Sequence, residues 1–320
     1  MSARLLEVRG LRTHFFTKAG VVKAVDDVSF GVDRGRVLGL VGESGSGKSM
    51  TGYSIMGLID PPGRIVSGSI TLAGTELTTL GDAAWRNLRG NRVTMVFQDP
   101  MMTLNPVLRI DTQMVEAVRA HHDVSLDAAL QRCREALVQV GIASPDERLL
   151  GYPHQFSGGM RQRVAIAIAL VNKPDVIIAD EPTTALDVTI QGQILHEMQR
   201  LSRESGTALI WITHDLSVIA GLADEVCVMY AGRIVESGGV DEVLDTPMHP
   251  YTRGLLDSVP SRNTPGRPLS QIRGMTPSLL ALGEACAFRE RCARAIDACR
   301  AAPVTQSIGT RGVRCVNPLA

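Results

Sequence analysis

The stretch GESGSGKS, Gly42–Ser49, lies between the apolar run VLGLV (37–41) and the segment MTGYSIMGLI (50–59). It matches the pattern G-x-x-x-x-G-K-S/T in full, with a buried strand expected before it and a helix after it. Successive backbone N–H groups of such a turn curl around an anion, and the first turn of the following helix adds positive partial charge. The sequence therefore predicts a loop that binds the phosphates of a nucleoside triphosphate.

Within this loop, different residues are expected to recognise different parts of the nucleotide. Lys48 is expected to reach the β- and γ-phosphates, and the Ser49 hydroxyl is expected to bind Mg²⁺. A glycine-rich turn with a chance lysine is the alternative, but the flanking strand and helix make it a poor explanation. The other residues expected to surround the phosphates are Gly42, Ser44, Gly45 and Gly47.

The composition is that of a protein with a large packed core. Of the 320 residues, 44% are hydrophobic and 21% are charged, and the net charge of 0 gives no reason to expect a nucleic acid partner. No apolar run reaches the length of a membrane span, and the start, MSARLLEVRG, lacks the apolar segment of a signal peptide. We therefore expect the chain to work in the cytosol.

The charge is distributed unevenly along the chain. From Tyr251 onward there are ten arginines against four acidic residues, so the first 250 residues of this neutral chain carry the opposite excess. This asymmetry predicts a domain of residues 1–250 followed by an extension of residues 251–320. Residues 259–280 contain four prolines and little periodicity, which indicates an extended connection.

Short apolar runs alternate with amphipathic segments in the first part of the chain. Strands that alternate with helices predict an α/β fold. The expected strands span residues 21–32, 36–41, 175–180, 208–213 and 225–230, with a hairpin edge at 231–238. Besides the helix after the glycine loop, helices are expected at residues 125–141, 158–171 and 188–206. Residues from about 100 to 170 lack strand-like runs and are expected to form an inserted helical subdomain.

A pair of acidic residues ends one of the expected strands, in VIIADEP (176–182). Asp180 is placed to hold Mg²⁺, through water, and Glu181 is placed to polarise an attacking water. A solvated acidic turn is the alternative, but a phosphate loop in the same chain argues against it. A carboxylate base beside Mg²⁺ predicts hydrolysis of the nucleotide rather than phosphoryl transfer to a metabolite.

A second candidate anion site lies in QFSGGMRQR (155–163), where Ser157, Gly158 and Gly159 begin a helix. One chain has no evident use for two such sites on a single γ-phosphate. In a head-to-tail dimer, each Ser-Gly-Gly stretch would close over the nucleotide held by the other chain. The pattern therefore predicts that two nucleotide-binding chains assemble.

Taken together, these motifs resemble those of the ATP-binding subunit of an ABC transporter. GESGSGKS is similar to the Walker A motif of that family, VIIADE to the Walker B motif, and FSGGMRQR to the family signature. Gln98 in VFQDP, the residues ALD (185–187) and His214 in ITHD resemble the Q-loop, the D-loop and the switch histidine. The resemblance covers about residues 5–245 and implies a P-loop NTPase core that binds ATP and Mg²⁺.

The resemblance also implies roles for the matched residues. Gln98 would sense the γ-phosphate and Mg²⁺ and link the site to membrane subunits. Asp187 would lie at the dimer seam, and His214 would contact the γ-phosphate. The adenine would stack on Phe15, with Phe16 as the alternative, and either ring could instead belong to the core.

Three details resemble the oligopeptide/dipeptide importer branch of the family. Met160 stands where the general signature has glutamine, and VFQDPMMTLNP (96–106) and HPYTRGLL (249–256) are similar to stretches of that branch. The resemblance implies an ATPase that powers the import of oligopeptides or dipeptides, with nickel or another peptide-like solute as the alternative. A non-transport ABC ATPase is least favoured, because the chain lacks a coiled-coil insertion or a second cassette.

The same resemblance implies several partners. They are a second ABC ATPase subunit, with a heterodimer favoured over a homodimer, two transmembrane permease subunits and an external substrate-binding protein. The chain would then lie peripherally on the cytoplasmic face of the membrane. Met101 and Met102 are expected to dock against the permease, because methionine adapts to irregular surfaces; a place in the helical core is the alternative.

Four of the six cysteines fall in the extension, at Cys286, Cys292, Cys299 and Cys315. Disulfides are disfavoured in the cytosol, and the spacings are wider than those of most zinc sites. Four thiolates can also hold a 4Fe–4S cluster. The extension resembles that of some peptide-importer ATPase subunits, which carry such a cluster there. Nearby arginines would offset its negative charge: Arg289, Arg291, Arg294 and Arg314. A cluster, a zinc ion and four unliganded thiols all stay open, whereas Cys133 and Cys227 are expected to be core residues.

Overall fold

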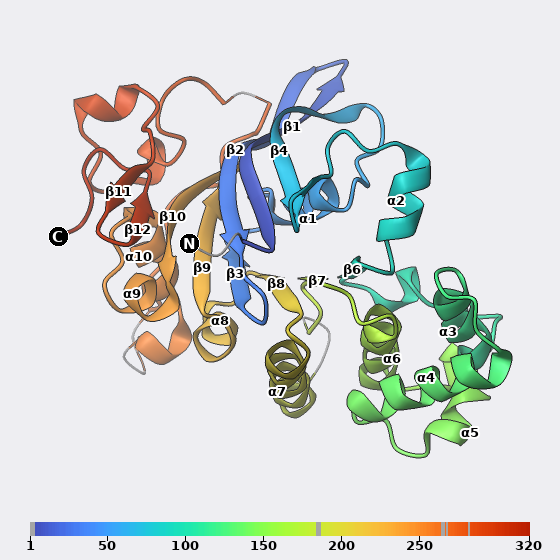
Figure 1. Ribbon diagram of the computed structural model, residues 1–320. Coiled ribbons are helices and arrows are strands. Elements are labelled where there is room, and N and C mark those ends of the chain that lie inside the picture. The colour runs from blue at the N-terminus through green and yellow to red at the C-terminus, as the bar shows by residue number, and fades with distance from the viewer. Residues whose placement is uncertain (1–3, 184–186, 264–265, 267, 281) are drawn as a thin grey trace. The chain divides into compact units, whose positions relative to one another are not determined.

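The computed structural model describes residues 4–183, 187–263, 266, 268–280 and 282–320 (Figure 1). Its contacts divide the chain into two compact units. The first comprises Met1–Val32, Leu38–Thr78 and Trp211–Ala320, and the second comprises Asp33–Val37 and Thr79–Ile210. Each unit is described by itself below.

An antiparallel sheet of four strands, in the order β2-β1-β4-β5, forms part of the first unit. Leu6, Val8 and Leu11 of β1 are buried, as expected for a sheet with one face on a core, and the register shifts between Val8 and Leu11. Leu6 pairs with a residue of β2 on one side and with a residue of β4 on the other. The strands are β1 Leu6–Thr17, β2 Gly20–Val32, β4 Gly63–Leu72 and β5 Thr75–Glu76.

Five strands of a second sheet also belong largely to the first unit, in the order β11-β12-β10-β9-β3. β3 runs parallel to β9, and all five of its residues are buried, which explains its uninterrupted apolar sequence. The strands are β3 Val37–Val41, β9 Glu225–Tyr230, β10 Arg233–Gly239, β11 Gln306–Ile308 and β12 Arg311–Val313. The helices of this unit are α1 Lys48–Ile55, α8 Leu216–Leu222, α9 Val240–Asp245 and α10 Pro250–Asp257.

In its described residues, the second unit contains the parallel pair β6 Val93–Val96 and β7 Val176–Asp180 together with six α-helices. Residues 100–170 are all described and contain helices and 3-10 turns but no strand, as the sequence predicts. The domain bounds at 100–170, 1–250 and 251–320 stay predictions. The helices are α2 Asp82–Leu88, α3 Ile110–Arg119, α4 Leu126–Gln139, α5 Pro145–Leu149, α6 Gly158–Leu170 and α7 Val188–Ser205. Strand β8 Ala208–Thr213 carries the chain from the second unit into the first.

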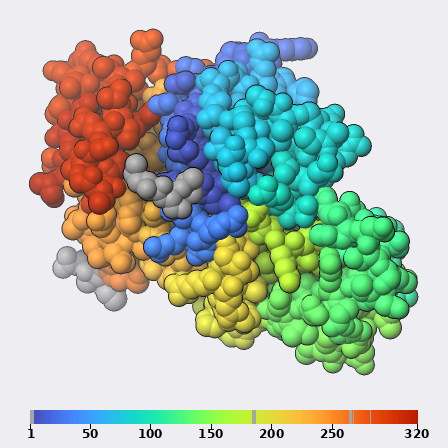
Figure 2. All heavy atoms as spheres, viewed as in Figure 1, coloured from blue at the N-terminus to red at the C-terminus, as the bar shows by residue number. Residues whose placement is uncertain are grey.

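The C-terminal extension, which begins with α10, packs against the rest of the first unit beside the segment that contains α9 (Figure 2). The sequence predicts that residues 231–238 form the edge of a sheet. The hairpin is confirmed, because β10 pairs antiparallel with β9. The edge position is wrong, because β12 pairs with β10 through Glu236 and Val313 and covers that edge. The short hairpin β11–β12 therefore joins the extension to the sheet that contains β3.

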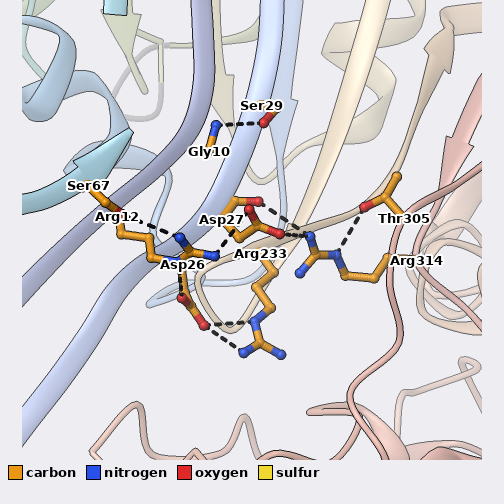
Figure 3. Close-up of polar contacts among 9 residues, drawn as sticks. All are labelled: Gly10, Arg12, Asp26, Asp27, Ser29, Ser67, Arg233, Thr305 and Arg314. Carbon is orange, nitrogen blue, oxygen red and sulfur yellow. Dashed lines mark hydrogen bonds and ion pairs between the residues drawn. The ribbon is translucent and has the colours of Figure 1, made fainter. Parts of the chain in front are cut away.

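Ion pairs fix the extension to the core of the first unit. Arg314 binds Asp27 of β2, and Arg311 binds the fully buried Glu236 of β10 (Figure 3 shows the first pair). A third ion pair joins Arg291 to Glu43. Carboxylates of the core therefore take up the charge of Arg291 and Arg314, whereas Arg289 and Arg294 line the cavity of the four cysteines. That the four arginines offset a cluster stays a prediction.

A second ion pair in Figure 3 lies within the core itself. Asp26 of β2 accepts hydrogen bonds from Arg233 at 2.6 and 3.0 Å and from Arg12 at 3.2 Å. Burial opposes ionisation of Asp26, but the hydrogen bonds from Arg233 outweigh it and hold the pKa of the carboxyl below its usual value. This pair fixes β2 to the first residue of β10.

Candidate active site

The glycine loop, residues 42–49, connects β3 to α1. Gly42, Gly45 and Gly47 have φ values of 155°, 76° and 102°, which side chains disfavour. A Cβ atom at Gly42 would lie 2.2 Å from the carbonyl oxygen of Met229, and one at Gly47 would lie 2.4 Å from that of Ala24. The loop therefore passes so close to β2 and β9 that only glycine fits at these two positions.

Lys48 begins α1 and is only 5% exposed. Its Nζ atom donates to the carbonyl oxygens of Gly42 at 2.8 Å and Glu43 at 3.0 Å, so the ammonium group lies inside the curve of the loop. Gly47, the residue before the helix, has no side chain that could cap the N–H groups of the first turn. These N–H groups and the lysine together form the kind of site that binds phosphate.

In the second unit, the end of β7 carries the predicted acidic pair. Asp180 is the last residue of the strand and is 4% exposed. Glu181 follows with φ of 45°, a left-handed conformation that costs free energy in a residue with a side chain. The Nε2 atom of Gln98 donates to Glu181 Oε2 at 3.3 Å, so two residues of the predicted site meet directly. The amide fixes the direction in which the carboxylate points.

The Ser-Gly-Gly stretch and Asp187, which lie 28 residues apart, line one hollow of about 630 Å³ in the second unit. Ser157 caps α6 by accepting from the N–H of Met160 at 3.3 Å, and Asp187 caps α7 by accepting from the N–H of Ile190 at 3.0 Å. The N-termini of two long helices therefore open onto this hollow, which Arg148 and Arg163 also line. Residues 185 and 186 of the predicted D-loop lie outside the described residues.

Comparisons with known proteins match both parts of the chain. Residues 25–184 match the family model described as "ABC transporter", and residues 235–299 match "Oligopeptide/dipeptide transporter, C-terminal region". The oligopeptide transport ATP-binding protein OppD of Salmonella typhimurium is 45% identical over 98% of this chain and 94% of its own length. OppD of Bacillus subtilis is 49% identical over 92% of this chain and 83% of its own length.

The chain belongs to the ABC transporter family, in its oligopeptide/dipeptide branch.

Solved structures show the same fold for this ABC protein. MJ0796, a bacterial ABC transporter cassette solved as a dimer, matches with a TM-score of 0.66 and 25% identity over 73% of this chain and 98% of that one. CbiO1 of Clostridium perfringens, part of the ABC transporter complex cbiONQ, matches with a TM-score of 0.65 and 27% identity over 76% of this chain and 91% of that one. The predicted α/β fold class and family are confirmed.

The remaining predicted residues of the ABC protein's ATP site lie in the first unit. His214 follows β8 and is exposed, and Asp215 beside it caps α8 by accepting from the N–H of Ser217 at 2.8 Å. The ring of Phe15 lies against Gly63, where a Cβ atom would come within 2.5 Å of it. The guanidinium of Arg64 already covers the ring of Phe16, at 4.3 Å from its centroid. The preference for Phe15 as the adenine platform stays a prediction.

One residue of the phosphate loop, Glu43, has partners that the sequence did not predict. Its carboxylate accepts two hydrogen bonds from Arg291, at 2.6 and 2.9 Å, and one from the hydroxyl of Thr276 at 3.1 Å. Its backbone N–H donates to the hydroxyl of Tyr251 at 2.9 Å. The hydrogen bonds from Arg291 hold the pKa of the Glu43 carboxyl below its usual value. The sequence offers one signal for these contacts, the excess of basic residues in the extension and of acidic residues before it. This signal does not identify which residues pair.

The cysteines of the extension lie together. All four line one small cavity, which His249 and Phe288 also border, and none forms a disulfide. Among the described residues, no group of three or more His, Cys, Asp or Glu side chains is arranged to hold a metal ion. Burial raises the pKa of the Cys286, Cys292 and Cys315 thiols.

The other two cysteines are buried core residues, as the sequence predicts. Burial raises the pKa of Cys133 to about 11 and that of Cys227 to about 12, so both are protonated near neutral pH.

No helix in the described part of the chain is both long and apolar enough to cross a bilayer.

Proposed function

We propose that the protein hydrolyses ATP to power a membrane permease that imports oligopeptides or dipeptides. The observation that carries the proposal is the match to OppD proteins over nearly the whole chain, the extension included. Both relatives are named oligopeptide transport ATP-binding proteins. The phosphate loop and the acidic end of β7 supply the groups that ATP hydrolysis needs.

Each predicted residue takes a separate part in this reaction. Lys48 and the N–H groups of its loop would neutralise the phosphates, and Ser49 and Asp180 would hold Mg²⁺, with Gln98 as a further ligand. Glu181 accepts a proton from the attacking water, and the Gln98 amide at 3.3 Å keeps its carboxylate oriented. His214 contacts the γ-phosphate, and Phe15 stacks on the adenine.

Assembly with a second ATPase subunit completes the proposal. The hollow lined by Ser157, Gly158, Gly159 and Asp187 receives the γ-phosphate of the nucleotide bound by that subunit. Two N-capped helices supply positive partial charge there, and two arginines add full charges. A heterodimer is favoured, with two transmembrane permease subunits and an external binding protein as further partners at the cytoplasmic face of the membrane.

The four cysteines of the extension are proposed to hold a 4Fe–4S cluster with a structural role. The backbone N–H of Cys286 donates to the carbonyl oxygen of Cys299 at 3.0 Å, and the N–H of Asn317 donates to Cys315 Sγ at 3.4 Å, so the thiols lie on a fixed frame. A single zinc ion, with Zn–S bonds of about 2.3 Å, needs four sulfurs nearly in contact. The proposal of a cluster rests on the shared cavity that the four cysteines line and on the resemblance of their segment to peptide-importer subunits that carry one.

Reconstitution tests the transport function. The chain, its permease and its partner ATPase are purified together and placed in vesicles with the binding protein, and uptake of labelled peptides is measured with and without ATP. We expect ATP-dependent peptide uptake, and sedimentation of the chain with membranes only when the permease is present. Uptake of nickel but not of peptides would mean that the substrate is nickel rather than a peptide. ATP hydrolysis by a chain that never binds a permease would reject the transport function.

A further inference from the structure

The carboxylate and both backbone polar groups of Glu43 have partners. Its carboxylate and its N–H bind residues of the last 70 positions of the chain, as described above. Its carbonyl oxygen accepts from Lys48 Nζ at 3.0 Å and from the N–H of Ser46 at 3.2 Å. One residue therefore joins the extension directly to the lysine of the phosphate loop.

The arginine that holds Glu43 is itself held firmly. Arg291 is 6% exposed at its side chain, and its Nε atom donates to the carbonyl oxygen of Arg273 at 3.0 Å. Its guanidinium lies 5.7 Å from the ring centroid of Tyr230 and 5.9 Å from that of Phe288. A guanidinium restrained by a backbone oxygen and two rings cannot follow Glu43 if the loop moves, so Arg291 sets the position of Glu43.

The rings around Arg291 form one cluster that spans the core and the extension. Tyr230 ends β9, Tyr251 belongs to α10, and Phe288 belongs to the extension; their centroids lie 4.6 to 5.4 Å apart. All three side chains are buried, and Tyr251 is the residue whose hydroxyl accepts from the Glu43 N–H. This aromatic cluster gives the extension a fixed place relative to the loop.

We propose that Arg291 is a positioning residue for ATP binding: it fixes Glu43, and through Glu43 the phosphate loop, and it neutralises a carboxylate that would otherwise repel the phosphates. The inference rests on the proposed function, because it concerns the same nucleotide. It assigns to the extension a direct part in ATP binding. Arg291 does not touch the nucleotide and acts only through Glu43.

A double-mutant cycle in the full-length chain tests the proposal. ATP affinity is measured for the wild type, Arg291→Met, Glu43→Gln and the double variant, together with KM and kcat of hydrolysis in the assembled complex. We expect Arg291→Met to raise the Kd and the KM for ATP by at least about tenfold, with a much smaller change in kcat, because it leaves a negative charge beside an anion site. In the Glu43→Gln background, the same substitution should change the Kd by less than about threefold.

Arg314→Met is the matched control. Arg314 also belongs to the extension, is 10% exposed at its side chain, and pairs with Asp27 rather than with the loop (Figure 3). It should lower the midpoint of thermal unfolding about as much as Arg291→Met does while leaving ATP affinity within about twofold of wild type. Arg291→Lys, which keeps the charge, should recover part of the lost affinity.

Two results would overturn the proposal. One is an ATP affinity of Arg291→Met equal to that of Arg314→Met. The other is a loss of ATP-binding free energy in the double variant equal to the sum of the losses in the two single variants. Both are measured against a wild type that binds and hydrolyses ATP. A wild-type chain that neither binds nor hydrolyses ATP would instead reject the proposed function.

Discussion

Glu43 and Glu181 are both glutamates of nucleotide-binding segments, but their partners suit them to different work. Two charge-assisted hydrogen bonds from Arg291 occupy the carboxylate of Glu43, which is therefore a poor proton acceptor. Glu181 receives a hydrogen bond from the neutral amide of Gln98. The occupied carboxylate of Glu43 is therefore a poor candidate for the general base, and Glu181, at the end of β7, stays our proposal for it.

Replacement of Glu181 by glutamine tests this assignment. Glu181→Gln keeps the size of the side chain but removes its basicity, so ATP binding should persist while phosphate release in the assembled complex falls by at least ~10²-fold. Steady-state phosphate release and ATP affinity are measured side by side. Glu197→Gln, a change on α7 of a residue paired with Arg200, is the control and should leave both unchanged. Near-normal phosphate release by Glu181→Gln would mean that the partner subunit's site carries the hydrolysis.

Among the elements, the short 3-10 turn Pro100–Met102 stands out because it exposes apolar side chains. Met102 is 78% exposed and Met101 is 37% exposed, whereas Leu104, two residues beyond Met102, is buried. The side chain of Asp99 caps this turn by accepting from the N–H of Met101 at 2.9 Å. The alternative that Met102 fills the helical core is therefore wrong, and a docking role for this turn is favoured.

A charge at Met102 should weaken docking to the permease. Met102→Glu is expected to reduce ATP-driven uptake in vesicles by at least about tenfold while ATP binding by the isolated chain survives, because a buried, unpaired carboxylate is costly at an interface. Met275→Glu is the matched control, since Met275 is a methionine of the extension that is 89% exposed. Equal uptake by the two variants would remove Met102 from the docking surface.

We expect the stability of the protein to depend on pH through His249, the residue that caps helix α10. His249 caps it, since the N–H of Tyr251 donates to His249 Nδ1 at 3.0 Å, and burial lowers the pKa of His249 to about 4. In the unfolded chain a histidine titrates near about 6.5, so between these values only the unfolded chain takes up the proton. The free energy of unfolding should therefore fall as the pH drops from about 6.5 to about 4, by up to about 3 kcal/mol from this group.

Chemical denaturation across this pH range measures the effect. Other groups titrate there too, so the informative quantity is the difference between the wild type and His249→Asn, which keeps a capping oxygen but does not titrate. The variant should lose less stability on acidification. Identical pH slopes in the two proteins would contradict the role of His249.

The elements that the sequence predicts are those that burial makes obvious. β3, β7 and β8 are buried along their whole length, so their apolar runs end where the strands end. β4 was missed because glycines and serines break its alternation, and β6 because it has only four residues. β11 and β12 have three residues each and exist because they pair with each other and with β10, a contact between distant segments that no local pattern carries.

At the scale of the whole molecule, the same limit applies to the site. Lys48, Asp180 and Glu181 are recognisable because the chemistry fixes their spacing within short motifs. The partners of the Glu43 carboxylate and N–H lie more than 200 residues away, and only the folded first unit brings them together. The excess of arginines in the extension indicated binding of some anion, but that anion is in part the carboxylates of the core rather than a cluster.

Metal content decides the remaining question about the extension. If the four cysteines hold a cluster, anaerobically purified protein should be brown, absorb broadly near ~400 nm and contain about four irons per chain. A serine at any one of the four positions should bleach the protein and make the extension sensitive to protease, because this segment has little apolar core of its own. Cys133→Ser is the control and should stay brown. Colourless protein with one zinc, or with no metal, would replace the cluster by a zinc site or by unliganded thiols.

The distance along the chain between Glu43 and its partners has a consequence for synthesis. Tyr251 and Arg291 follow Glu43 by 208 and 248 residues. A ribosome that adds about 5–20 residues per second makes Arg291 roughly 12–50 seconds after Glu43. Throughout that interval the nascent chain displays a complete phosphate-binding motif, but the carboxylate of Glu43 still lacks Arg291. If Arg291 positions the loop as proposed, a chain whose translation stops between His214 and Arg291 would carry every motif of the ATPase and bind ATP weakly. Messages cut short in this interval would then not yield subunits able to occupy a permease and consume ATP without transport.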